Sequence, residues 1–225
     1  TCEVYGVKPV IVLNKIDIVD EFRDDFAPAL ENFHRIYEGA GYSILEVSAK
    51  TGRGVDELRR LCLEKSEDGA PGISLFSGVS GVGKTWLALH WAAQVSRRFR
   101  VDEPGAVYYF TQENEPCIVL QPRLQALGAE LSRVAIQKFT TDSPTLTLDD
   151  ERLELAAHVI PPRLVIFDPI QSYLGAGVEM NKANEVRPIL DWLGRFAQRY
   201  NCAVVLVSHM AKPGANNSDA LDRLL

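Results

Sequence analysis

The feature that most constrains this chain is the octapeptide GVSGVGKT at Gly78–Thr85. It matches the pattern G-x-x-x-x-G-K-[S/T], follows the apolar run ISLFSG and precedes the helix-forming run KTWLALHWAAQV. Glycines let backbone N–H groups turn inward around a phosphate, and the following helix adds the positive end of its dipole. A strand, this loop and a helix in succession predict an α/β fold with a phosphate-binding site.

Apolar strand-like runs and amphipathic helix-like runs alternate along the whole chain. The first strand is expected at Val10–Leu13, and about seven strands can be counted in all. Strands separated by helices favour a parallel sheet covered on both faces. We therefore predict a three-layer α/β/α fold of the P-loop NTPase class with a mainly parallel sheet of about seven strands. In TLDDERLELAAHVI, Thr147 or Asp149 is the candidate helix N-cap.

The loop and a later strand end supply the candidate phosphate and metal ligands. Lys84 would reach the β- and γ-phosphates, and the Thr85 hydroxyl would hold Mg²⁺. Asp168, in FDP at the end of a buried strand, suits a carboxylate that supports Mg²⁺, the alternative being a loop or capping aspartate. The backbone predicted to cradle the phosphates comprises Gly78, Val79, Ser80, Gly81, Val82 and Gly83.

Three further side chains are candidates for catalysis. Glu113, in FTQENE just past a strand end, could orient or deprotonate the attacking water, with Glu115 as its rival. His209, in VSHMAK, could sense the γ-phosphate or be a structural histidine. Arg223 could act in trans as an arginine finger, although a solvated arginine is the alternative.

Two loops earlier in the chain carry the residue types that can recognise a purine base. They are NKID at Asn14–Asp17 and SAKTGRG at Ser48–Gly54, each following a strand. A carboxylate can accept hydrogen bonds from N1–H and N2–H₂ of guanine, a donor pair that adenine lacks. An asparagine amide can meet the purine N7/O6 edge, a backbone amide can meet O6, and lysine stems can cover the ring faces. The candidate base-binding residues are Asn14, Lys15, Asp17, Ser48, Ala49 and Lys50.

Composition narrows the possible partners. The formal net charge is −6, so no basic surface favours nucleic acid. The four cysteines are scattered, which predicts reduced thiols in a cytoplasmic protein and no zinc site. No apolar run approaches the length of a membrane span. The chain begins at Thr1 without a methionine, and we expect a fragment or an assembled product.

Residues 1–85 resemble the circularly permuted GTPases of the ribosome small subunit-dependent GTPase A family. The segments KPVIVLNKIDIVDE, VSAKTGRGVDELR and ISLFSGVSGVGKT place the base loops before the phosphate loop, the reverse of ordinary small GTPases. The resemblance implies GTP as ligand and the ribosome as partner. The family's switch threonine, its DxPG motif and its zinc-binding domain have no counterpart here.

Residues 73–225 resemble RecA-like ATPases of the hexameric replicative helicase type, and most closely the RepA-like AAA ATPases. The similar segments include VYYFTQENE, RLVIFDPIQSYLGAGVEMNKANEVRPIL and CAVVLVSHMAK. The resemblance implies ATP as ligand, with nucleic acid and an oligomer as possible associations. It also implies that Glu113 is the catalytic carboxylate, Asp168 the Mg²⁺-linked aspartate and His209 the phosphate sensor.

The two resemblances meet at the phosphate loop, which indicates an engineered or recombinant chimera. We expect a single domain over residues 1–225, with a base-recognition part at 1–72 and an ATPase part at 73–225. The parts are predicted to share one sheet through a central strand at Ile73–Ser77, and two separate sheets would contradict this. The expected activity is Mg²⁺-dependent binding and slow hydrolysis of GTP or ATP. A folded scaffold with weak or no catalysis and an interaction module in replication or ribosome assembly are the alternatives.

Overall fold

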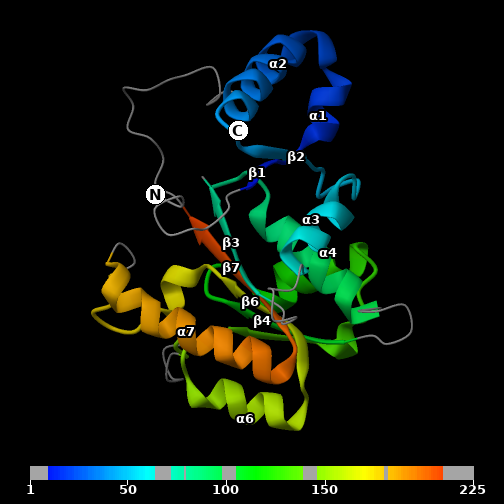
Figure 1. Ribbon diagram of the computed structural model, residues 1–225. Helices are drawn as coiled ribbons and strands as arrows, with labels where there is room; N and C mark the ends of the chain where they lie inside the picture. Colours follow the sequence, from blue (N-terminus) through cyan, green and yellow to red (C-terminus); the bar gives the residue numbers. More distant parts are fainter. Residues whose placement is uncertain are drawn as a thin grey trace. The chain divides into compact units, whose positions relative to one another are not determined.

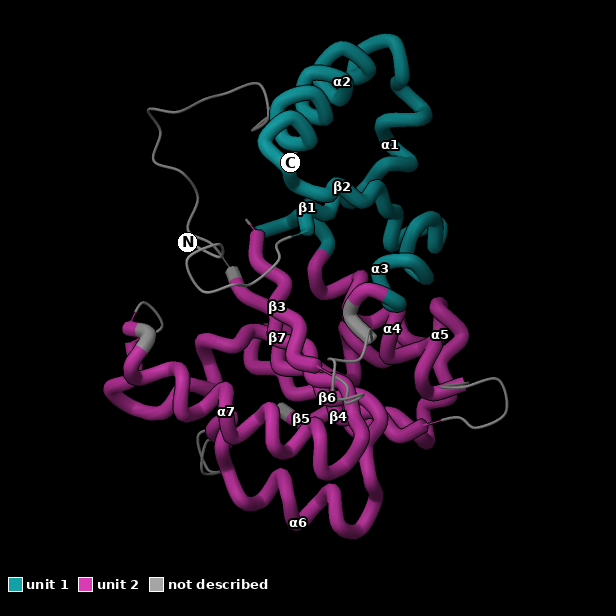
Figure 2. The backbone as a smooth tube through the Cα atoms, in the orientation of Figure 1, with its two compact units in different colours: residues 1–60, 79–83, 211–225 teal, residues 61–78, 84–210 magenta. Residues whose placement is uncertain are grey.

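The structure is a computed structural model that describes residues 10–63, 72–78, 80–97, 105–138, 146–179 and 182–209. The chain divides into two compact units, coloured separately in Figure 2. Unit 1 comprises Thr1–Arg60, Val79–Gly83 and Ala211–Leu225, and unit 2 comprises Leu61–Gly78 and Lys84–Met210. The phosphate loop is therefore divided between the two units.

Unit 1 is built around two short parallel strands, β1 (Val10–Leu13) and β2 (Ser43–Glu46). Helices α1 (Ile16–Glu21) and α2 (Arg23–Gly39) connect them, and α3 (Val55–Leu63) begins in this unit (Figure 1). The carboxyl ends of parallel strands lie at the same edge of a sheet. The loops after β1 and β2 therefore meet.

Unit 2 contains a five-stranded, all-parallel sheet with the order β3-β7-β6-β4-β5. Its central strand β6 is buried at every residue except Arg163, as expected for a strand covered on both faces. The strands are β3 (Ile73–Gly78), β4 (Ala106–Thr111), β5 (Val134–Lys138), β6 (Pro162–Asp168) and β7 (Ala203–His209).

Helices cover both faces of this sheet. On one face α4 (Lys84–Arg97) packs against β3, β4, β6 and β7, and α5 (Gln121–Ala126) packs on α4. On the other face, α6 (Glu151–Val159) and α7 (Ala183–Tyr200) enclose an aromatic-rich core in which Phe110 and Phe167 stack at 4.9 Å between ring centroids. Short turns complete the unit: η2 (Pro116–Leu120), η3 (Leu131–Arg133) and η4 (Ile170–Tyr173).

The structure confirms the predicted α/β class, and its described residues contain the seven strands. The prediction of one shared sheet is wrong, because the described strands form a two-stranded and a five-stranded sheet. Among them β3 is an edge strand whose ladder partner is β7, and β1 pairs with β2. Apolar runs specify strands locally, but the choice of ladder partner depends on segments far apart in the chain.

Candidate phosphate, metal and base site

The phosphate loop has the backbone that a Gly-rich anion cradle needs. Gly81 and Gly83 have φ values of +88° and +91°, a region that other residues rarely adopt. A Cβ at Gly83 would lie 2.4 Å from Nδ2 of Asn14, whereas a Cβ at Gly81 would meet nothing within 4 Å. Helix α4 begins at Lys84 with no acidic residue in its first turn, so its N-terminus favours an anion. Val79 lies outside the described residues.

Lys84 is the buried cation of the site. Its side chain is 7% exposed, and Nζ donates a 2.7 Å hydrogen bond to the carbonyl oxygen of Gly78. Burial lowers the pKa of the ammonium group, while the charges of Asp168 and Glu113 raise it. Because water is largely excluded, an anionic ligand would compensate for the desolvation of this charge.

Thr85, Asp168 and Tyr109 form a buried hydrogen-bonded cluster in unit 2. Both the Thr85 hydroxyl and the Tyr109 phenol donate to Oδ2 of Asp168, each over 2.8 Å. Asp168 and Tyr109 are fully buried. Burial, followed by the charge of Asp168, raises the pKa of the Tyr109 phenol well above its usual value, so it stays a donor.

The Thr85 hydroxyl and the Asp168 carboxylate are groups that suit Mg²⁺ as ligands. Hydroxyl and carboxylate oxygens are the hard ligands that Mg²⁺ prefers, and the ion commonly completes its shell with water and substrate phosphates. Within the part of the chain that the structure describes, no group of three or more His, Cys, Asp or Glu residues could hold a metal alone. A Mg²⁺ ion at the Thr85–Asp168 pair would take its other ligands from water and phosphates.

The two candidate base loops meet within unit 1. Ser48 is buried and its hydroxyl donates a 2.6 Å hydrogen bond to Oδ1 of Asp17. The exposed Lys50 ammonium lies 3.9 Å from Oδ2 of the same carboxylate. Lys15 has a left-handed backbone with φ +67°, a conformation that is uncommon outside glycine and enriched at functional sites. The carboxylate of Asp17 is thus oriented by the second loop.

Asn14 links both base loops to the phosphate loop. Its Oδ1 accepts a 3.0 Å hydrogen bond from the backbone N–H of Ala49. Its Nδ2 donates a 2.8 Å hydrogen bond to the carbonyl oxygen of Val82. The predicted role of this amide at the purine edge did not include its bond to the phosphate loop.

The structure describes some of the candidate catalytic residues fully and others only in part or not at all. Glu113 and Glu115 are both exposed beyond β4, and the charge of Glu113 acts on Lys84. The backbone of His209 pairs in register with Gly78, at the same end of the sheet as the phosphate loop. The side chain of His209 and all of Arg223 lie outside the described residues. Near this edge Gln171 donates a 3.0 Å hydrogen bond to the buried Ser208 hydroxyl, a contact that no motif had indicated.

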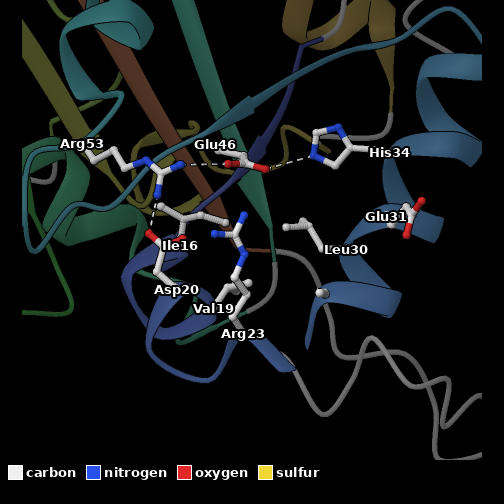
Figure 3. Close-up of a pocket in the computed structure, with 10 residues that line it drawn as sticks. Ile16, Val19, Asp20, Arg23, Leu30, Glu31, His34, Glu46 and Arg53 are labelled. Atoms are coloured by element: carbon white, nitrogen blue, oxygen red, sulfur yellow. Dashed lines mark hydrogen bonds and ion pairs between the residues drawn. The ribbon is translucent and has the colours of Figure 1, made fainter. Parts of the chain in front are cut away.

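A separate cavity of about 370 Å³ lies in unit 1 between α1, α2 and β2 (Figure 3). Arg53 bridges the carboxylates of Asp20 and Glu46. The ring nitrogens of His34 lie 3.1 Å from Oε1 of Glu46 and 3.0 Å from Oε1 of Glu38. None of the candidate site residues lines this cavity. The charged network joins α1 and α2 to β2 and takes one member, Arg53, from the base loop Ser48–Gly54.

The family model described as AAA domain matches residues 69–215, well over half of the chain. The chain belongs to this AAA domain family. The model described as RsgA GTPase matches residues 1–100. Both resemblances drawn from the sequence are thereby confirmed, and the two matches overlap over residues 69–100, which contain β3, the phosphate loop and α4. The two families together support nucleotide binding and hydrolysis by a P-loop.

Curated relatives match the first part of the chain. The small ribosomal subunit biogenesis GTPase RsgA of Pseudomonas fluorescens (strain Pf0-1) is 41% identical over 93 residues, which is 41% of this chain and 24% of that protein. The protein of the same name from Haemophilus influenzae (strain PittEE) is 40% identical over 90 residues, covering 40% and 23%. The one from Photorhabdus laumondii is 38% identical over 86 residues, covering 38% and 22%. The chain thus spans about a quarter of these relatives' length.

Among the described residues, no helix is both long enough and apolar enough to cross a membrane.

Proposed function

We propose that this chain binds a Mg²⁺–nucleoside triphosphate, with GTP preferred, and hydrolyses it slowly. The observation that carries the proposal is the side chain of Asn14, which joins Ala49 of one base loop to Val82 of the phosphate loop within unit 1. Base-recognising and phosphate-binding segments are thereby tied to each other by two hydrogen bonds. Segments tied together in this way are better suited to binding the base and the phosphates of one nucleotide than two unconnected loops would be.

The phosphate end would be held by residues of the loop and of unit 2. Backbone N–H groups of Gly78–Gly83 and the Lys84 ammonium would bind the phosphates, and Thr85 and Asp168 would hold Mg²⁺. When bound, Mg²⁺ would neutralise negative charge on the phosphates. Glu113 would position the attacking water and accept its proton.

The base end would be read by the loops after β1 and β2. Asp17, held by Ser48, would accept hydrogen bonds from N1–H and N2–H₂ of guanine. Lys15 and Lys50 would cover the ring. The Ala49 N–H, which donates to Oδ1 of Asn14, would turn to guanine O6 when the base binds. Hydrogen bonds to a charged group are worth about 1.5–3 kcal/mol, enough for clear selection against adenine.

ATP is the second candidate ligand, and membership of the AAA domain family favours it. The two candidates make different demands on unit 1, because adenine offers Asp17 no donor pair. We further propose that the chain is a recombinant joint between the two families within residues 69–100. Cytoplasmic location is a proposal that rests on the scattered cysteines. An oligomer, and ribosome or nucleic-acid association, are proposals that rest on family resemblance.

Calorimetric titration with GTP and ATP, each with Mg²⁺ and with EDTA, tests binding, and phosphate release tests turnover. We expect Mg²⁺-dependent binding and turnover well below that of enzymes with an arginine finger, which contributes about 10³- to 10⁵-fold. Glu113→Gln should bind nucleotide and lose turnover, whereas the matched Glu115→Gln variant should keep both. Binding without turnover in the wild type would support the scaffold alternative, and no binding of either nucleotide would refute the proposal.

A further inference from the structure

We propose that Tyr109 is a positioning residue that fixes the carboxylate of Asp168 for the metal, an inference that rests on the proposed function. Oδ2 of Asp168 accepts two 2.8 Å hydrogen bonds, one from Thr85 of α4 and one from Tyr109 of β4. Sequence motifs identify Thr85 and Asp168, but not Tyr109. The phenol is the third member of the cluster.

The place of Tyr109 in the sheet explains why it reaches this carboxylate. Strand β4 runs parallel to β6, with Tyr109 opposite Ile166 and Thr111 opposite Asp168. The tyrosine therefore sits two residues short of the strand end and spans that distance with its long side chain. A shorter side chain at Tyr109 would not reach Asp168, and a phenylalanine would reach it without a donor.

The hydroxyl group of Tyr109 is buried, so it needs a hydrogen-bond partner. The side chain is 0% exposed, and a buried hydroxyl is unfavourable unless it has a hydrogen-bond partner. Phenylalanine would fill nearly the same volume without that requirement. The partner of the phenol is a charged carboxylate, and charge-assisted hydrogen bonds are the stronger kind.

The second hydrogen bond restricts the rotation of the carboxylate. An aspartate carboxyl group turns readily about χ2, and a single bond to Thr85 leaves much of that freedom. With Tyr109 on the same oxygen, donors from two different elements determine which oxygen faces Thr85. Because Thr85 is the proposed metal ligand, Tyr109 acts on Mg²⁺ through Asp168 and makes no contact with the nucleotide in this proposal.

The test measures how strongly Mg²⁺ improves nucleotide affinity in Tyr109→Phe. Affinity for GTP is determined by calorimetry at several Mg²⁺ concentrations and in EDTA. Loss of a residue that orients a metal ligand typically weakens metal affinity by about 10- to 100-fold. We expect a loss of that size in the Mg²⁺-dependent part and unchanged affinity in EDTA, because the phosphate cradle remains.

Tyr173→Phe is the matched control. Tyr173 is also fully buried, its ring centroid lies 5.2 Å from that of Phe167, and its hydroxyl has no hydrogen-bond partner among the described residues. This variant should keep the wild-type response to Mg²⁺. In an Asp168→Asn background, Tyr109→Phe should add little further loss, because the residue through which it acts has already been altered.

The outcomes separate the two proposals. If the wild type binds GTP with Mg²⁺ and Tyr109→Phe has the same Mg²⁺ dependence, the positioning role is wrong and the proposed function stands. If Tyr109→Phe loses affinity equally in EDTA, or fails to fold, the residue serves packing and the inference is likewise overturned. If Mg²⁺ does not improve GTP affinity in the wild type, the proposed function fails, and the role of Tyr109 fails with it.

Discussion

At the scale of single residues, the phosphate loop depends on two glycines for different reasons. Both Gly81 and Gly83 have positive φ, so any side chain at either position strains the backbone. Only at Gly83 would the added Cβ also collide with the amide of Asn14. The amide that links the base loops to the phosphate loop thus needs the absence of a side chain at Gly83.

We predict that Gly83→Ala lowers nucleotide affinity more than Gly81→Ala does. Positive φ disfavours alanine at both positions by about 1–2 kcal/mol, so the difference between the variants reports the displacement of Asn14. That difference should be about tenfold in the dissociation constant for GTP. The measurement is calorimetric titration of both variants, with folding checked by circular dichroism. Equal losses would show that the Asn14 contact does not matter for binding.

At the scale of secondary-structure elements, a histidine joins α2 to β2. His34 contacts Glu38 on its own helix and Glu46 on β2, and Arg53 also binds Glu46. The hydrogen bond to Glu38, together with the hydrogen bond and charge from Glu46, raises the pKa of His34 above 6.5, although burial opposes the shift. The protonated imidazole is therefore favoured in the folded state.

We predict a pH-dependent contribution of His34 to the stability of unit 1. Because the folded-state pKa is the higher one, the contribution is fully present below the unfolded value of about 6.5 and is lost as the pH rises through the folded value. The groups are partly exposed, so the effect should stay below about 1 kcal/mol. Urea unfolding at pH 6 and pH 8 should show a smaller pH difference in His34→Gln than in the wild type. His158→Gln, which leaves this cluster intact, should preserve the wild-type pH difference. A His34→Gln variant with the same pH difference in stability as the wild type would contradict the prediction.

A second link between elements joins β4 to the end of α6. The phenol oxygen of Tyr108 lies 3.0 Å from the carbonyl oxygen of Ala156 and 2.6 Å from that of Ile160, so its proton serves carbonyl groups at the helix C-terminus. We predict that Tyr108→Phe lowers the free energy of unfolding by about 1–3 kcal/mol, because the Ile160 carbonyl loses the phenol as its donor, whereas the Ala156 carbonyl keeps the N–H of Ile160. Tyr173→Phe should be nearly neutral in the same urea titration. A neutral Tyr108→Phe would show that solvent replaces the phenol.

Local patterns predicted the elements better than their pairing. The apolar run at Val10–Leu13 is β1, and each of the seven expected strands is present among the described residues. The N-cap of α6 is Asp150, whose Oδ1 accepts from the Arg152 N–H over 2.9 Å, so the prediction of Thr147 or Asp149 was wrong. Which of several neighbouring polar residues becomes the N-cap depends on backbone dihedral angles that the sequence does not specify. Strand pairing depends on contacts distant in sequence, and the shared sheet was accordingly mispredicted.

In the candidate site, too, local motifs were predicted better than contacts between segments distant in sequence. Motif spacing identified Thr85 and Asp168, and the structure brings their side chains within 2.8 Å. It also brings together Asp17 and Ser48, which lie on separate loops. Tyr109 and the bond from Asn14 to Val82 were missed, because both depend on which segments are neighbours in space. Their roles in binding remain predictions.

At the scale of the whole molecule, the phosphate loop belongs to both parts of the chain. Ser80–Gly83 fall in unit 1 with the base loops, and Gly78, Lys84 and Thr85 fall in unit 2 with Asp168. The matches to the two families overlap at this same segment. The central claim is that the base loops and the phosphate loop serve one nucleotide.

The most direct test is the ratio of GTP to ATP affinity in the wild type, Asp17→Asn and Asp20→Asn. Asp20 is on the same helix, α1, but pairs with Arg53 rather than with Ser48 or Lys50, so its variant matches the change of charge and leaves the Asp17 carboxylate and its partners in place. We predict that the wild type prefers GTP, and that Asp17→Asn weakens GTP by about 10- to 100-fold with little change for ATP. Asp20→Asn should keep the wild-type ratio. Equal weakening of both nucleotides in Asp17→Asn, or no weakening of either, would contradict the claim.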